Sequence, residues 1–102
     1  MIFLPGEFYH VYNRGNNKQL IFLENDNYIY FLQKMKKEIA AIADIAAYCL
    51  MPNHYHIILY VREDTDENKS KILSRKLGTL QSSYAQGMNK RYGTVDLYFN
   101  KK

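Results

Sequence analysis

The sequence is poor in the residues that build disulfide frameworks and membrane spans. Its 102 residues include a single cysteine, Cys49, which excludes an internal disulfide and a multi-cysteine zinc site. No apolar run approaches the ~20 residues of a membrane helix, and the N-terminus lacks the basic and apolar segments of a signal peptide. We therefore expect one globular domain in the reducing cytoplasm, with no membrane partner.

Acidic residues are missing from one long segment of this basic chain. The net charge is +4, and the range from Lys69 to Val95 contains six basic residues without any Asp or Glu. A segment of one sign suits a polyanion such as nucleic acid, although a solvated helix face would carry the same pattern. Ten tyrosines and five phenylalanines could stack on bases, but most of them are expected in the core.

Several stretches have the alternation or the residue content of β-strands. In Phe8–Asn13, apolar residues alternate with residues that can be polar, and the turn signal Asn13-Arg14-Gly15 ends this expected strand. Asp44–Leu50 and His54–Val61 flank the turn Met51-Pro52-Asn53, so we expect them to form an antiparallel hairpin. Asp96–Asn100 is predicted to form a short fourth strand.

Two helices are expected between these strands. The first begins at a cap on Asn25 or Asp26, and its apolar residues recur three and four apart. The second is capped by Ser70 and runs to about Tyr92, where Gly93 ends it. The order strand, helix, strand, strand, helix, strand predicts an α+β fold of the ferredoxin-like split βαβ type, with two helices on one face of an antiparallel sheet.

Two of the three histidines stand one residue apart at the start of a strand. His54 and His56 therefore project from the same face, where both could ligate one cation, although two surface histidines would give the same pattern. His10 lies on the first strand, the neighbour of the third in this fold, and could act as a ligand or orient one. Cys49 could also approach, but a free cysteine is usually buried, so we expect a small core residue.

The segment Met51-Pro52-Asn53-His54-Tyr55-His56 resembles the His-hydrophobic-His signature of HUH endonucleases. Specifically, the chain resembles the single-tyrosine transposases of insertion sequences and the REP-associated tyrosine transposases. The run from Tyr9 to Gly15 is similar to the opening strand of this family. The segments Ser83-Tyr84-Ala85 and Asn89-Lys90-Arg91-Tyr92-Gly93 are similar to its basic second helix and following turn.

This resemblance implies an enzyme of DNA transposition that binds hairpins in single-stranded DNA. A tyrosine attacks the scissile phosphate and leaves a 5′-phosphotyrosine and a free 3′-OH, splitting the transfer into two reversible steps. A divalent cation, Mg²⁺ or Mn²⁺, would be held by His54 and His56 with one further polar ligand. The metal polarises the phosphodiester and stabilises its leaving oxygen. Family members often pair, and an uncovered fourth-strand edge would favour a homodimer.

The nucleophile of this family lies in a helical Tyr-x-x-x-Gln or Tyr-x-x-x-Asn pattern, which this sequence does not offer at the matching place. Tyr84 precedes Asn89 by five positions, ~140° apart on a helix, and Tyr98 precedes the cation Lys102 by four. The matching segment would follow Asn100. We therefore expect residues 1–102 to form a transposase domain that lacks its nucleophile helix and binds DNA without cutting it. Tyr84 is the fallback nucleophile.

Contacts to DNA are expected from five basic residues, each of which could also be a solvated surface charge. They are Arg14, Arg75, Lys76, Lys90 and Arg91. Two other hypotheses for the function remain. One is a non-catalytic nucleic-acid-binding domain, although the aromatic pattern of ferredoxin-like RNA-binding modules is absent. The other is a zinc hydrolase using His10, His54 and His56, which lacks a well-placed Glu or Asp base.

Overall fold

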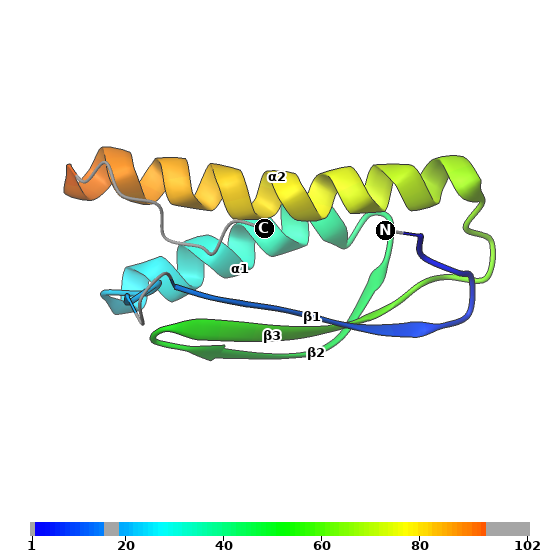
Figure 1. The fold of residues 1–102 in the computed structure, drawn as a ribbon, viewed down its shortest axis with the longest axis horizontal. Helices are drawn as coiled ribbons and strands as arrows, with labels where there is room; N and C mark the ends of the chain where they lie inside the picture. The colour runs from blue at the N-terminus through cyan, green and yellow to red at the C-terminus, as the bar shows by residue number, and fades with distance from the viewer. Residues whose placement is uncertain (1, 16–18, 94–102) are drawn as a thin grey trace.

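The structure is a computed structural model that describes residues 2–15 and 19–93. A three-stranded antiparallel sheet carries two helices on one face, as the sequence predicts (Figure 1). In chain order the elements are β1 (Phe8–Arg14), α1 (Asn25–Ile39), β2 (Asp44–Met51), β3 (His54–Tyr60) and α2 (Glu67–Tyr92). Three of the four predicted strands lie within the described residues and agree with the observed ones to within one residue at each end.

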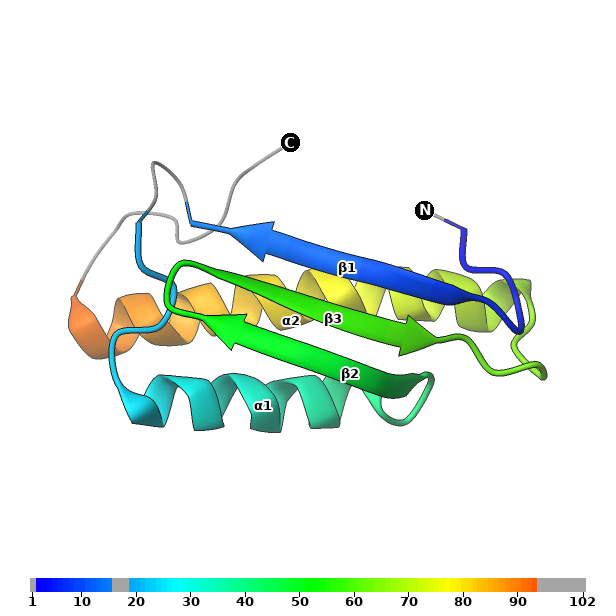
Figure 2. The same ribbon diagram turned by 90° about the horizontal axis from the view of Figure 1, so that it is seen from below.

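The sheet has the strand order β1-β3-β2, in which β3 pairs antiparallel with both neighbours. Parallel β1 and β2 therefore flank β3, and α1 makes the crossover between them, which is the split βαβ arrangement. Figure 2 shows both helices behind the sheet, with α1 along the β2 side. The predicted fourth strand, Asp96–Asn100, lies outside the described residues. No helix of the described ranges has the length and apolar character of a membrane span.

Alternation along β3 separates the two faces of the sheet. Tyr55, Ile57 and Leu59 are buried against the helices, whereas the residues between them are half-buried on the other side. We call that side the open face, because no described element covers it. Its strand positions are Phe8, His10, Tyr12 and Arg14 on β1, His54, His56, Ile58 and Tyr60 on β3, and Asp44, Ala47, Cys49 and Met51 on β2.

Backbone hydrogen bonds join the loops at the end of the sheet where His54 lies. The N–H of Gly15 donates to the carbonyl of Asn53 (2.9 Å), and the N–H groups of Ile21 and Phe22 both donate to the carbonyl of Pro52. A Cβ atom on Gly15 would collide with the backbone carbonyl of Gln19, so only glycine fits this turn. The hairpin that carries the histidine pair is thus fixed to the segment that leads from β1 to α1.

Both helices are capped by residues other than the predicted ones. The cap of α1 is Glu24, whose backbone N–H donates to Oδ1 of Asn27 (2.8 Å). The cap of α2 is Asp66, whose carboxylate accepts from the N–H of Lys69 (2.8 Å). Ser70 instead lies buried in the first turn, where its hydroxyl accepts from the N–H of Phe3. The predictions of Asn25 or Asp26 and of Ser70 as caps were wrong, because Glu24 and Asp66, upstream of the predicted caps, accept from the first-turn amides of Asn27 and Lys69. The predicted end at Gly93, in the left-handed region, is confirmed.

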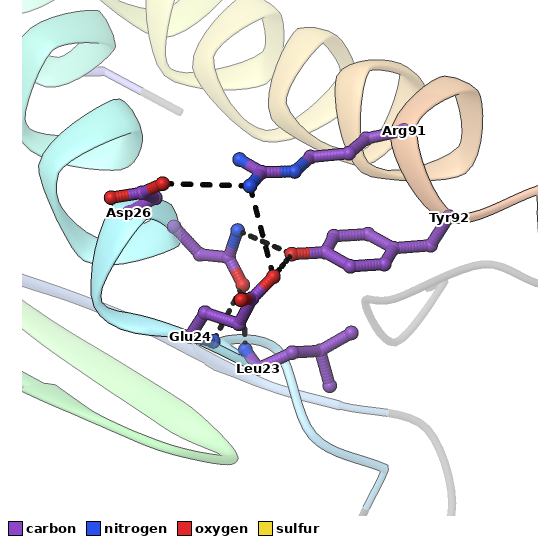
Figure 3. Close-up of polar contacts among 6 residues, drawn as sticks. Leu23, Glu24, Asp26, Arg91 and Tyr92 are labelled. Carbon is purple, nitrogen blue, oxygen red and sulfur yellow. Dashed lines mark hydrogen bonds and ion pairs between the residues drawn. The ribbon is translucent and has the colours of Figure 1, made fainter.

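A polar cluster ties the start of α1 to the end of α2 (Figure 3). Asn27, only 1% exposed, accepts from the N–H groups of Leu23 and Glu24 and donates to the hydroxyl of Tyr92 (3.1 Å). That hydroxyl donates in turn to the carboxylate of Glu24. Arg91 forms ion pairs with Glu24 and Asp26. The C-terminal end of α2 is therefore held at the end of the molecule where the β2–β3 hairpin turns (Figure 1).

Two glycines inside α2 offer a matched test of this helix packing. Gly78→Ala should raise the free energy of unfolding by about 0.5–1 kcal/mol, because alanine has the higher helix propensity and no atom obstructs its Cβ. Gly87→Ala brings the same gain, but its Cβ collides with the Tyr30 side chain, whose ring packs on Tyr84. We expect a net loss of about 1 kcal/mol there. Urea denaturation of both variants measures the difference, and equal stabilisation would contradict this packing.

Candidate functional site

The three histidines lie together on the open face. His10 on β1 is paired with Ile58, and the next open-face residue, Tyr12, is paired with His56, so His10 lies diagonally across from His56. Nε2 of His10 is 2.8 Å from Nδ1 of His56, and the two rings stack with centroids 5.0 Å apart. His10 thus contacts the pair through a direct hydrogen bond between imidazoles.

His54 is oriented by the turn that precedes it. Its Nδ1 lies 2.7 Å from Oδ1 of Asn53, an oxygen that can only accept, so the Nδ1–H donates. The rings of His54 and His56 meet edge to face with centroids 5.2 Å apart. Since Nδ1 of each histidine is already engaged, Nε2 is the atom that each can offer to a ligand. Metal-bound histidines are typically fixed in this way by a bond at the other nitrogen.

Crowding of the rings changes the electrostatics of His56. Partial desolvation, followed by repulsion from His10 and His54, lowers the pKa of its imidazole below the ordinary value of 6.5. A lowered pKa keeps His56 neutral at pH 7. The neutral imidazole is the form that binds a metal ion.

His10→Ala should raise the pKa of His56 toward its ordinary value, because the substitution removes a neighbouring charge and exposes the ring. The titration of the ring nitrogens, followed by NMR in the presence of a chelator, measures this shift. Ile58→Ala alters a neighbouring open-face side chain without removing a charge and serves as the control. A His56 pKa that does not rise in His10→Ala would exclude repulsion by His10 as a cause.

Cys49 lies on the open face and not in the core. It pairs directly with His56 across the β2–β3 ladder, and its side chain is exposed. The prediction of a small core residue was wrong because the register is shifted between Ile45 and Ala47, which changes the face of the residues that follow. The sequence gives no clear signal for such a shift.

The fallback nucleophile Tyr84 is remote from the histidines. It is fully buried in the helix layer, on the other side of the sheet, and its hydroxyl donates to the carbonyl of Ile21 (2.8 Å). Tyr12, by contrast, is 66% exposed on the open face, with its ring centroid 6.1 Å from that of His56. Its position beside the histidine pair depends on the register between β1 and β3, which the sequence does not give.

The five predicted DNA contacts divide between two regions. Arg14 is exposed on the open face and is paired with His54 across the ladder. The other four lie on α2, in the layer behind the sheet, where Arg75 and Lys90 are exposed. Lys76 forms an ion pair with Glu38 (3.1 Å), and Arg91 pairs with Glu24 and Asp26. These two cations are therefore partly neutralised by side chains of the same molecule.

Within residues 2–15 and 19–93, no group of three or more His, Cys, Asp and Glu side chains is placed to hold one metal ion. The described side chains therefore do not form a three-histidine zinc site, and His10 bonds to His56 instead. What they do form is a two-histidine pair with both Nδ1 atoms engaged. Further ligands would be water, a substrate phosphate or a residue beyond these ranges.

Comparison of the sequence with protein-family models and with curated proteins gave no match.

Proposed function

We propose that this chain is the metal- and DNA-binding domain of an enzyme that nicks and joins single-stranded DNA, as its resemblance to single-tyrosine HUH transposases implies. The observation that carries the proposal is the orientation of His54 and His56 on the open face, each with Nδ1 engaged. Imidazole ligands add no negative charge of their own, so the cation that they would hold, Mg²⁺ or Mn²⁺ as the resemblance implies, would keep its full charge for an anionic substrate. Its remaining positions would take oxygen ligands, which these hard cations prefer.

The residues of this chain would act by binding and orientation. His54 and His56 would hold the cation, which when bound would polarise a phosphodiester and stabilise its leaving oxygen. His10 and Asn53 would keep the two rings in place. Arg14, exposed beside His54, would contact a phosphate of the same strand.

The strand transfer itself would use a tyrosine. Its hydroxyl would give up a proton as its oxygen forms a bond to the phosphorus, and the bond from phosphorus to the 3′-oxygen would break. The leaving oxygen would take up a proton and become the free 3′-OH, so the step is balanced in protons. The burial of Tyr84 and its hydrogen bond to Ile21 favour a structural role for that residue. We therefore propose a nucleophile outside the described residues, as the resemblance implies. We also propose that the protein acts in the cytoplasm and as a homodimer.

Paramagnetic NMR tests the metal site directly. Mn²⁺ added to the chain should broaden the ring signals of His54 and His56 first, because broadening falls off steeply with distance from the ion. Single-stranded hairpin DNA should then tighten Mn²⁺ binding, since a phosphate oxygen supplies a further hard ligand. Broadening confined to surface carboxylates such as Glu67, with the histidine signals unchanged, would refute the site.

A non-catalytic nucleic-acid-binding domain is the second candidate, favoured by the exposed rings of Phe8 and Tyr12 on the open face. In that case nucleic acid would bind equally well with and without a divalent cation, and its affinity would fall steeply with salt. Metal dependence of DNA binding therefore separates the two functions.

A further inference from the structure

A row of rings runs along β1 on the open face. Phe8, His10 and Tyr12 occupy alternate positions of the strand, so their Cα atoms follow one another at ~6.8 Å. Phe8 is 63% exposed and Tyr12 66% exposed, although β1 pairs along its whole length with β3. Exposed aromatic residues are ordinary when scattered singly, but a row on one sheet face indicates a binding surface.

Ring contacts extend this row onto β3. The rings of His10 and Tyr12 are 5.0 Å apart, and His56 stacks on both of them, at 5.0 and 6.1 Å. At the other end, the ring of Phe8 lies 5.0 Å from that of Tyr60. The outer rings are thus supported by neighbours that limit their freedom, which lowers the entropic cost of stacking a ligand on them.

The charges beside the row favour an anion at the Tyr12 end. Arg14 is the next open-face residue of β1 and is exposed. Asp44 is the one carboxylate among the open-face strand positions of the described residues, and Arg62 neutralises it at 2.9 Å. Glu63 accepts from the hydroxyl of Tyr60 at the opposite end. The phosphate contacts of a bound strand would therefore lie near Arg14 and Tyr12, whereas the end with Phe8 and Tyr60 would contact its bases.

We infer that Phe8 and Tyr12 form a stacking platform for unpaired bases of a single-stranded nucleic acid that crosses the open face. Aromatic rings bind any base through its exposed face, whereas the bases of a duplex are already stacked on each other. Arg14 contacts the backbone of the same strand. The inference rests on the proposed function for the identity of the strand as DNA, but the platform itself requires no metal.

Fluorescence anisotropy with a short fluorescein-labelled oligothymidylate in EDTA tests the platform. Tyr12→Ala and Phe8→Ala should each weaken binding about 5- to 100-fold, the range for loss of one base–aromatic stack. Tyr12→Phe keeps the ring and should bind like the parent chain. Tyr48→Ala is the matched control, because Tyr48 is also an exposed strand aromatic (53%) but pairs with Ile57, which faces the helices.

Cys49 reports independently which face is occupied. Its thiol is exposed on the open face directly across from His56, and it is the only cysteine of the chain. Bound oligothymidylate should slow its reaction with a thiol reagent such as DTNB. A blunt duplex of the same length should protect it far less.

Three results would overturn the platform: oligothymidylate that fails to bind, equal losses in Tyr12→Ala and Tyr48→Ala, or a Cys49 that reacts at the same rate with and without the strand. Circular dichroism checks the fold of each variant. If an alanine variant unfolds, Tyr12→Phe still tests the platform, because it keeps the aromatic ring and should bind like the parent chain. Because all binding is measured without metal, a chain that binds strands here but shows no Mn²⁺ site at His54 and His56 would refute the proposed function alone. An oligouridylate arm shows whether the platform distinguishes RNA from DNA.

Discussion

Replacing His54 by alanine should lower the affinity of the chain for Mn²⁺ by at least about 100-fold, because loss of a direct ligand exceeds the ~10–100-fold cost of losing a residue that orients one. Isothermal titration calorimetry at a pH above 7 measures the affinity, because a histidine binds a metal only in its deprotonated form. His54 is half-buried, and the polar contact of its ring within the described part of the chain is to Asn53, so the variant should fold normally.

Substitutions of residues near His54 should give graded losses of Mn²⁺ affinity. His10→Ala and Asn53→Ala each remove the partner of one Nδ1 atom and should weaken Mn²⁺ binding about 10- to 100-fold. Cys49→Ala changes a side chain beside His56 that is not a ligand for this hard cation and should leave the affinity unchanged. If His54→Ala binds Mn²⁺ as tightly as Cys49→Ala does, the ion is held elsewhere and the proposed metal site is wrong.

Much of the fold follows from periodicity in the sequence. Alternation in His54–Val61 and the Pro-Asn turn before it are enough to predict a hairpin whose histidines share one face, and the structure has this arrangement. The helices follow from apolar spacing, but their caps do not, because Glu24 and Asp66, upstream of the predicted caps, accept from amides of the first turns. Capping depends on side-chain geometry that spacing does not encode.

The candidate site is less predictable than the fold, because it depends on pairing between strands distant in the sequence. The one-residue shift near Ala47 decides that Cys49 faces His56. The register of β1 with β3 likewise decides that Tyr12 and Arg14 flank the histidine pair. In the sequence, the alternation of Phe8, His10 and Tyr12 is equally compatible with either face being buried.

Asn27→Ala should destabilise the fold by about 2–4 kcal/mol, because it removes three hydrogen bonds at a position that is almost completely buried. The N–H groups of Leu23 and Glu24 would lose their acceptor, and the hydroxyl of Tyr92 would lose a donor (Figure 3). Urea denaturation followed by circular dichroism gives the free energy of unfolding.

Asn25→Ala is the control for this experiment, since it makes the same chemical change at an exposed position in the first turn of α1 and should cost less than about 0.5 kcal/mol. Asn27→Asp keeps the acceptor oxygen for the two backbone amides but loses the amide donor to Tyr92, so it should fall between the two. Equal stability of Asn27→Ala and Asn25→Ala would mean that water replaces the lost bonds. In that case the joint between α1 and α2 must depend instead on apolar packing, such as the contact of Phe31 with Tyr84.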